Sequence, residues 1–235
     1  MATAPAFAQS PIRAPALLER WVSECTNAQG EYDLADAERS CTAIIRSDIA
    51  TSGARAFAYR QRGFVHFQRG DQTRALADFS DAVRYNPHFA EGYISRAALY
   101  EARGEYALGA ADYDQVLRIL PTFGPAYNAR CWLRTLGGID LAAARIDCDR
   151  AIELGVGAPA YDTRGLLNLK EGRFDAALAD YETAVDAGHE AHSLYGRGLA
   201  ALRVGRTEAG EADIANATTA DPQLAQAYQR YGVEP

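Results

Sequence analysis

Two stretches of the chain carry residue types used in catalysis and phosphate binding, and neither has the spacing that this chemistry needs. A His-Glu-Ala-His stretch at 189–192 has the residues of a zinc-protease helix, but its second histidine comes one residue too early to share a helical face with the first. A Gly-Arg-Gly stretch at 196–198 lies inside an expected helix with no strand before it, which excludes a phosphate-binding loop. The sequence therefore predicts no enzyme, no metal site and no cofactor.

A residue pattern that recurs about every 34 residues predicts the elements that hold these side chains. Each copy has a large residue at its fourth position and small residues at its eighth and twentieth, so two antiparallel helices can approach closely. A glycine then ends the first helix, because glycine tolerates the left-handed conformation of a helix C-cap. These glycines are Gly70, Gly104, Gly138, Gly172 and Gly205. Pro87, Pro121 and Pro222 end the second helix of their copies.

The pattern resembles the tetratricopeptide repeat (TPR) in its residues and its period. The resemblance implies an all-α fold, in which about six antiparallel helix hairpins form a right-handed superhelical solenoid with a C-terminal capping helix. The resemblance covers nearly the whole chain. Within the family, the chain resembles exported bacterial TPR proteins. The regular repeats are expected at 56–89, 90–123, 124–157, 158–190 and 191–224.

Two flanking segments complete the expected array. A degenerate repeat with a linker is expected at 18–55, because residues between 21 and 44 fall on the repeat positions. The linker is expected around 51–53. A capping helix is expected at 225–235, where Tyr228 and Tyr231 match the start of another first helix. Such a helix covers the apolar face that the last repeat would otherwise expose to water.

The four cysteines form two pairs in matching repeat positions. Cys25 and Cys41 occupy the eighth and twenty-fourth positions, which face each other across a helix hairpin, and so do Cys131 and Cys148. The even count, the matched geometry and a possible export signal favour two disulfides, Cys25–Cys41 and Cys131–Cys148. The alternative is that four thiols fill buried positions suited to small apolar groups, as they would in a cytosolic protein.

Arginine recurs at the seventh position of the repeats and aspartate at the twenty-third, so each arginine is expected beside an aspartate of the facing helix. One interpretation is a row of arginines for an acidic ligand. The other, which the equal number of aspartates favours, is a set of structural ion pairs that fix the hairpin register. The expected pairs are Arg62–Asp78, Arg96–Asp112, Arg130–Asp147, Arg164–Asp180 and Arg197–Asp213.

In TPR proteins the first helix of each repeat lines a concave surface, so the resemblance also implies a partner-binding groove. The groove positions carry aromatic and apolar residues with scattered charge, and large aromatic side chains commonly anchor a peptide. The alternative is that these side chains pack between neighbouring first helices. The expected partner-binding residues are Phe57, Arg60, Phe64, Phe67, Ile94, Asn128, Trp132, Leu166, Lys170, Tyr195 and Arg203.

Composition and the start of the chain bear on the compartment and the class of partner. Hydrophobic residues make up 48% of the chain, and the net charge of −7 argues against a nucleic-acid partner. No apolar run approaches the length needed for membrane insertion. Residues 6–8 have the small-x-small form of a signal-peptidase site. Residues 1–17 are therefore expected to be a disordered tail, which is either the remnant of a signal peptide or an ordinary Ala/Pro-rich end.

Together these observations and the resemblance predict an exported, periplasmic scaffold or adaptor that binds another protein or a peptide without catalysis; a cytoplasmic location is the alternative. A second function class is a binder of an envelope glycan or lipid. Isolated aromatics beside Asn128 and Asp162 would suit a sugar, whereas a continuous apolar strip favours a peptide. A third possibility is a self-assembling structural protein. The oligomeric state and the identity of the partner do not follow from the sequence.

Overall fold

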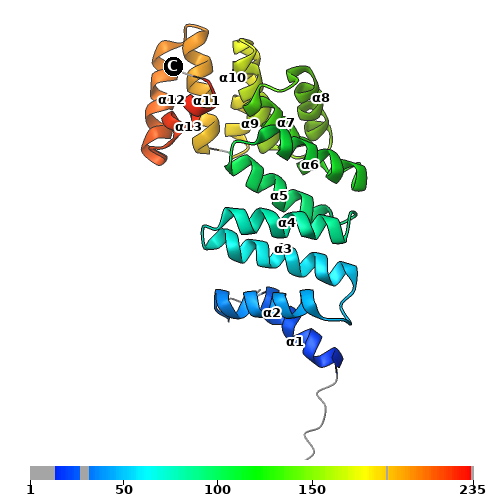
Figure 1. Ribbon diagram of the computed structural model, residues 1–235. Coiled ribbons are helices and arrows are strands. Elements are labelled where there is room, and N and C mark those ends of the chain that lie inside the picture. Colours follow the sequence, from blue (N-terminus) through cyan, green and yellow to red (C-terminus); the bar gives the residue numbers. More distant parts are fainter. Residues whose placement is uncertain (1–13, 27–31, 189, 234–235) are drawn as a thin grey trace, which may run out of the picture. The chain divides into compact units, whose positions relative to one another are not determined.

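The computed structural model describes residues 14–26, 32–188 and 190–233, and this part of the chain forms thirteen α-helices and no strand (Figure 1). The helices are α1 (Ala14–Thr26), α2 (Leu34–Arg46), α3 (Ser52–Gln68), α4 (Gln72–Tyr85), α5 (Ala90–Ala102), α6 (Tyr106–Ile119), α7 (Gly124–Gly137), α8 (Leu141–Glu153), α9 (Ala158–Lys170), α10 (Phe174–Asp186), α11 (Glu190–Arg203), α12 (Thr207–Ala220) and α13 (Leu224–Arg230). The predicted all-α helical-repeat fold is confirmed. The expected signal-peptidase site and His189 lie outside the described residues.

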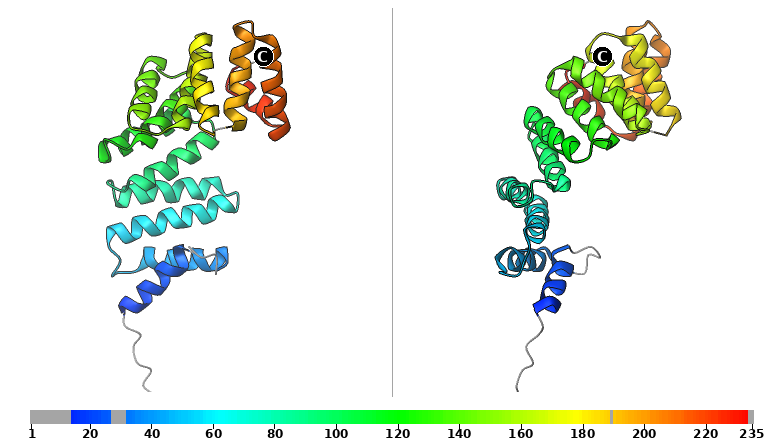
Figure 2. Two further views of the ribbon diagram at one scale, coloured as in Figure 1. Left: turned by 180° about the vertical axis from the view of Figure 1, so that it is seen from behind. Right: turned by 90° about the vertical axis from the view of Figure 1, so that its right-hand side faces the viewer.

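The chain divides into two compact units, residues 1–95 and 96–235. In the first unit, α1, α2, α3 and α4 pack in sequence order, each on the next. In the second unit the same holds from α6 through α12, and the first helices α7, α9 and α11 also contact one another in order. Figures 1 and 2 show the partners of a pair, such as α3 with α4 or α11 with α12, side by side in each view. Consecutive helix pairs are thus the building blocks of both units.

The helix boundaries follow from glycine and proline. The five recurring glycines that end first helices have φ between 62° and 80°, a backbone conformation that residues with a Cβ rarely adopt. Pro87, Pro121 and Pro222 each follow directly after the C-cap residue of α4, α6 and α12. Since proline cannot continue the hydrogen-bond ladder, the second helix stops there and the next pair begins.

The start of α3 differs from the predicted linker. Residues 51–53, which the sequence assigned to a connection, form the N-cap and first turn of this helix. The hydroxyl of Thr51 accepts a hydrogen bond from the Ala54 backbone N–H at 3.1 Å, which satisfies one of the donors that a helix start leaves open. Upstream, α1 begins at Ala14, inside the segment expected to be a tail.

The crossing point of each helix pair is where the eighth and twenty-fourth positions meet. A Cβ atom at Gly63 would lie 2.6 Å from the Phe79 ring, and one at Gly165 would lie 2.9 Å from the Tyr181 ring. At these two crossing points the large ring of the second helix is accommodated by a glycine on the first. The two cysteine pairs occupy the same crossing points with small residues on both helices.

Both cysteine pairs lie at disulfide distance. The sulfur atoms of Cys25 and Cys41 are 2.06 Å apart with their Cα atoms at 4.8 Å, and those of Cys131 and Cys148 are 2.04 Å apart with their Cα atoms at 5.4 Å. These Cα separations fall within the range of native disulfides. The bonds join α1 to α2 and α7 to α8.

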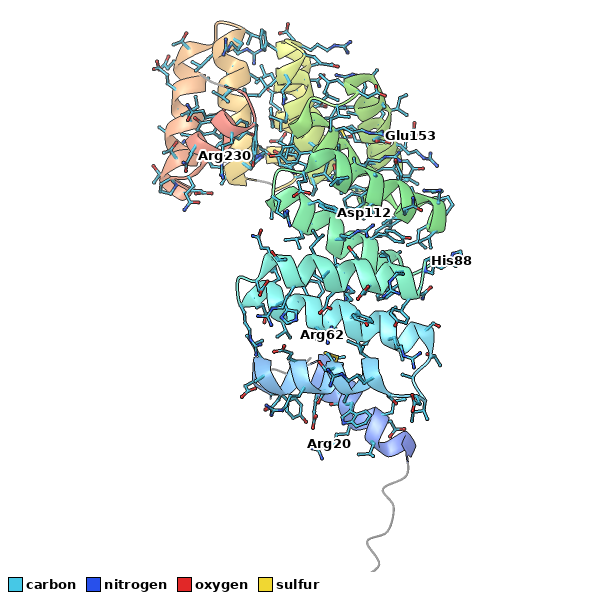
Figure 3. All side chains as sticks on the ribbon, viewed as in Figure 1. Arg20, Arg62, His88, Asp112, Glu153 and Arg230 are labelled. Atoms are coloured by element: carbon cyan, nitrogen blue, oxygen red, sulfur yellow. A yellow bond between two sulfur atoms is a disulfide. The ribbon has the colours of Figure 1, made fainter. Side chains whose placement is uncertain are left out.

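Each regular helix pair also contains a bidentate Arg–Asp ion pair. Arg62 donates from Nε and Nη2 to the two carboxylate oxygens of Asp78, both at 2.8 Å, and this hydrogen bonding raises the pKa of Arg62. The same bidentate geometry joins Arg96–Asp112, Arg130–Asp147, Arg164–Asp180 and Arg197–Asp213. Figure 3 labels one partner from each of two pairs, Arg62 and Asp112. This geometry holds each arginine against the facing helix of its pair.

We expect a titration of the denatured, unreduced protein to find no reactive thiol and the reduced protein to show four. Reduction should also lower the free energy of unfolding by about 3 kcal/mol for each disulfide, because each bond closes a loop of 16 or 17 residues in the unfolded chain. Urea unfolding with and without reductant measures this. Four reactive thiols before reduction would contradict the pairing.

Asp147 of α8 pairs with two arginines, because it accepts from Nη1 of Arg134 at 2.6 Å as well as from Arg130. Asp147→Ala should lower the free energy of unfolding by about 3 kcal/mol, since it leaves two partly buried guanidinium groups without this carboxylate. The matched control is Asp114→Ala, which removes a half-exposed carboxylate 2.6 Å from the same Arg130 and should cost below about 1 kcal/mol. Equal losses in urea unfolding would contradict a structural role specific to Asp147.

Candidate functional site

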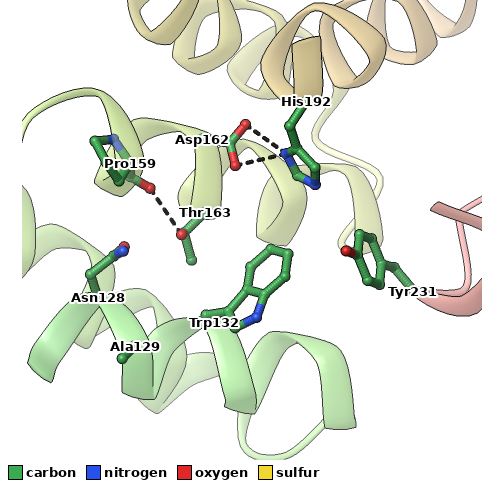
Figure 4. Close-up of a pocket in the computed structure, with 8 residues that line it drawn as sticks. All are labelled: Asn128, Ala129, Trp132, Pro159, Asp162, Thr163, His192 and Tyr231. Carbon is green, nitrogen blue, oxygen red and sulfur yellow. Dashed lines mark hydrogen bonds and ion pairs between the residues drawn. The ribbon is translucent and has the colours of Figure 1, made fainter. Parts of the chain in front are cut away.

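A cavity of about 430 Å³ lies in the second unit among the first helices α7, α9 and α11 and the end of α13 (Figure 4). Its volume falls within the range of small-ligand sites. The lining residues are Asn128, Ala129, Trp132, Pro159, Asp162, Thr163, His192 and Tyr231. The cavity thus joins two predicted groove residues, Asn128 and Trp132, to six that the predicted set did not include.

Helix α7 supplies one wall. Asn128 and Trp132 are four residues apart and therefore lie on the same face of the helix. The indole Nε1–H of Trp132 donates to Glu101 Oε1 of α5 at 2.7 Å, which fixes the ring orientation. The amide oxygen of Asn128 is buried and has no hydrogen-bond partner. A buried polar atom left in this state is unusual, because native proteins pair nearly all such atoms.

Asp162 of α9 is the charged group of the cavity. It is only 5% exposed, and it accepts a hydrogen bond from the Ser193 hydroxyl at 2.5 Å. Nδ1 of His192 lies 2.9 Å from Asp162 Oδ2, so this nitrogen is the one that carries the proton facing the carboxylate. Ser193 and His192 thus position the aspartate between α9 and α11. On the same helix, Thr163 donates its hydroxyl proton to the Pro159 carbonyl at 2.9 Å, and its oxygen keeps acceptor capacity.

Three aromatic rings pack together at the edge of the cavity. The Trp132 ring centroid lies 5.2 Å from that of Tyr231 and 5.8 Å from that of His192, both in edge-to-face geometry. Such arrangements stabilise aromatic pairs beyond the area that they bury. Burial raises the pKa of the Tyr231 hydroxyl, so it remains protonated at neutral pH. The rings form a rigid wall, with Asp162 beside them (Figure 4).

The C-terminal helix α13 covers part of the inner face of the first helices. Tyr228 is fully buried, and its hydroxyl donates to the His192 carbonyl at 2.9 Å. Its ring lies 4.8 Å from the Tyr195 ring, and its hydroxyl is 3.4 Å from that of Tyr181. Burial raises the pKa of both Tyr228 and Tyr181 well above the ordinary value. The predicted C-terminal helix is therefore present, and it reaches back as far as α7 through Tyr231.

This placement of α13 corrects two predicted groove residues. Leu166 is 0% exposed and Tyr195 is 2% exposed, and both belong to the core cluster that includes Tyr228. Tyr195 is covered by α13, whose Tyr228 ring lies 4.8 Å from the Tyr195 ring, and Leu166 belongs to the same core cluster. Both side chains are buried in this structure, at positions that the sequence pattern assigned to a partner.

Two basic residues of the predicted groove have other contacts. The Lys170 ammonium donates to the carbonyls of Thr135 and Leu136 at 2.8 and 3.3 Å, at the C-terminal end of α7. It therefore stabilises the open carbonyls and negative dipole end of that helix. Burial lowers the pKa of Lys170. Arg203 is exposed, with its guanidinium 5.9 Å from the centroid of the Phe174 ring.

The predicted groove residues of the first unit lie mainly on α3. The Arg60 guanidinium sits over the Phe64 ring at 4.7 Å and donates from Nε to Ser95 Oγ at 2.8 Å; burial lowers its pKa. Phe64 in turn packs edge-on against Phe79 at 5.3 Å. Phe67 is 43% exposed. The remaining two, Phe57 and Ile94, are half-buried.

Sequence reasoning missed His192, Thr163 and Tyr231 as cavity residues. His192 is at the second position of its repeat, as Phe57 is in its own. This shared position could have identified His192 as a groove residue. Tyr231 could not be assigned to the cavity from its position in the chain, because its contact with Trp132 depends on how α13 folds back.

Neither metal chemistry nor membrane insertion gains support within the described ranges. No group of three or more His, Cys, Asp or Glu side chains there is arranged to hold a metal ion. Among the helices described, none combines the length and the apolar character that crossing a membrane requires.

Comparison with known families identifies the repeat. The family model of the tetratricopeptide repeat matches residues 61–122 and 163–225, over half of the chain. The chain is a tetratricopeptide repeat protein. Members of this family commonly bind other proteins or peptides and are generally non-catalytic scaffolds, so TPR architecture supports an interaction scaffold as the general function. A search of the curated proteins found no match.

Solved TPR structures share the fold. A TPR protein from Parabacteroides merdae is 20% identical with a TM-score of 0.74, and the alignment covers 92% of this chain and 89% of that one. TTC0263 from Thermus thermophilus is 20% identical with a TM-score of 0.59, covering 75% and 97%. YrrB, described as a TPR protein with an unusual peptide-binding site, is 19% identical with a TM-score of 0.55, covering 74% and 92%. At these identities the likeness establishes the fold alone.

The docking of α13 predicts that Tyr228 stabilises the second unit. Tyr228→Ala should lower the free energy of unfolding by about 3–5 kcal/mol, because it empties a fully buried aromatic site. Tyr228→Phe should cost about 1 kcal/mol, since it removes only the hydroxyl that donates to the His192 carbonyl. Urea unfolding followed by circular dichroism measures both. An unchanged stability in Tyr228→Ala would contradict the packing of α13 on the inner face.

Proposed function

We propose that this TPR protein is a scaffold whose second unit binds an extended peptide segment of a partner protein at the cavity lined by Asn128, Trp132 and Asp162. The observation that carries the proposal is the convergence of side chains from three successive first helices on one cavity of peptide-side-chain size. An aromatic wall beside a few polar groups is the usual composition of such sites. The amide of Asn128 is suited to hydrogen-bond a peptide backbone, whose N–H groups need acceptors.

We also propose that the protein acts in an exported, periplasmic compartment. The two cysteine pairs at disulfide distance support this, because disulfides persist in oxidising surroundings and are rare in the cytosol. The small-x-small pattern at 6–8 is consistent with export. A protein that showed four free thiols when isolated from cells would favour the cytoplasmic alternative.

A glycan is a second candidate ligand, and one observation favours it. With Leu166 and Tyr195 in the core, the apolar strip expected for a peptide is interrupted in the second unit. Trp132 and Tyr231 remain as an isolated aromatic cluster beside Asn128 and Asp162, which is the arrangement expected for a sugar.

A peptide-display selection on the full chain tests the proposal. Selected peptides, labelled and titrated by fluorescence anisotropy, should bind Trp132→Ala at least about tenfold more weakly than wild type, because buried aromatics carry most of the energy of such interfaces. Asn128→Ala should weaken binding less. Thermal unfolding of each variant separates lost affinity from lost stability.

The matched control is Leu108→Ala, which removes a half-exposed apolar side chain from α6 of the same unit, outside the cavity lining. It should leave peptide affinity unchanged. Affinities that fall equally in Leu108→Ala and Trp132→Ala would place the peptide elsewhere. Failure to select any peptide, together with saturable binding of envelope oligosaccharides that Trp132→Ala abolishes, would replace the peptide with the glycan.

A further inference from the structure

The cavity of the second unit offers acceptors and negative charge, and its lining includes neither lysine nor arginine. Among its eight lining residues Asp162 is the one with a formal charge when His192 is neutral. Asn128 adds an amide oxygen without a hydrogen-bond partner. The Thr163 hydroxyl donates its proton to the Pro159 carbonyl, so toward a ligand it can act only as an acceptor. A ligand group rich in N–H donors would complement these atoms.

The aromatic wall points to the same class of ligand. A cation over the face of a Trp or Tyr ring is attracted by its π system, and a planar guanidinium also stacks on such a ring. Trp132 and Tyr231 are held rigidly by their mutual contact and by the Trp132–Glu101 hydrogen bond, so little ordering is needed on binding. The overall charge of −7 favours the approach of a basic partner over an acidic one.

We propose that the cavity recognises a basic side chain of the partner peptide, with the guanidinium of arginine as the group that fits best. This deepens the peptide-binding function proposed above and rests on it for the source of the side chain. The guanidinium donates to Asp162 and Asn128 and lies against the ring of Trp132. Arginine fits better than lysine because its five donors and flat surface serve several acceptors and an aromatic wall at once.

Small probes test the chemistry without a known partner. The chain has two tryptophans, so in a Trp21→Phe background the emission of Trp132 reports on the cavity alone. N-acetyl-argininamide should change this emission saturably at millimolar concentration. N-acetyl-citrullinamide has nearly the same shape without the charge and should bind about tenfold more weakly, because the charge-assisted hydrogen bonds are lost. N-acetyl-lysinamide should fall between the two.

Asp162→Asn should abolish the preference for arginine over citrulline, and Asp175→Asn, which removes an exposed carboxylate from α10 of the same unit, should leave it intact. Because Asp162 is buried, circular dichroism must show that each variant is folded. Asn128→Ala, at a half-buried position, is a second test and should weaken binding of the arginine probe about threefold or more. Equal binding of arginine and citrulline probes, or no response to arginine, would overturn the proposal. Selected peptides that bind through Trp132 but show no loss when arginine is replaced by citrulline would overturn it too, and would leave the peptide-binding function standing.

Discussion

In the regular helix pairs an aspartate of the second helix is largely withdrawn from water, and an arginine of the first helix donates two hydrogen bonds to its carboxylate. Asp78, Asp112 and Asp147 are 5%, 4% and 2% exposed. An ionised carboxylate in such a place is unfavourable without a partner, so a hairpin shifted by one residue would bury both groups unpaired. The pair contributes little net stability over an apolar alternative, and we propose that its role is to specify one register. The register of each hairpin in turn determines which side chains of its first helix face the groove.

The repeat could be predicted because its determinants are local and recur. Glycine at the end of a first helix, proline after a second, and a small residue opposite a large one each act within a single hairpin, so their spacing in the chain is their spacing in the fold. The cysteine pairs follow the same rule, because the eighth and twenty-fourth positions meet in every hairpin. The connection lies at 47–51 and not around 51–53, because Thr51 is the N-cap of α3, a local signal that the repeat register did not include.

The candidate site was harder to predict, because its composition depends on contacts between repeats. Asn128 and Trp132 could be identified from their position on α7, whereas Tyr231 joins them only through the fold-back of α13. The same fold-back covers Tyr195, at a position where the repeat pattern alone predicts exposure. A pattern derived from the average repeat describes an interior copy well. It fails for the copies against which α13 packs.

Lys170, which binds the end of α7, is also the only lysine among the 24 basic residues of the chain. All the others are arginines, whose guanidinium groups keep their charge at any pH at which a protein remains folded. The arginine charge of this molecule is therefore independent of pH, and below neutral pH the changes in net charge come from its carboxylates and its four histidines. For the same reason, reagents directed at amines would find one side chain in the whole protein, and that one is engaged with backbone carbonyls. Chemical capture of a partner would have to proceed through acidic groups or photoreactive probes.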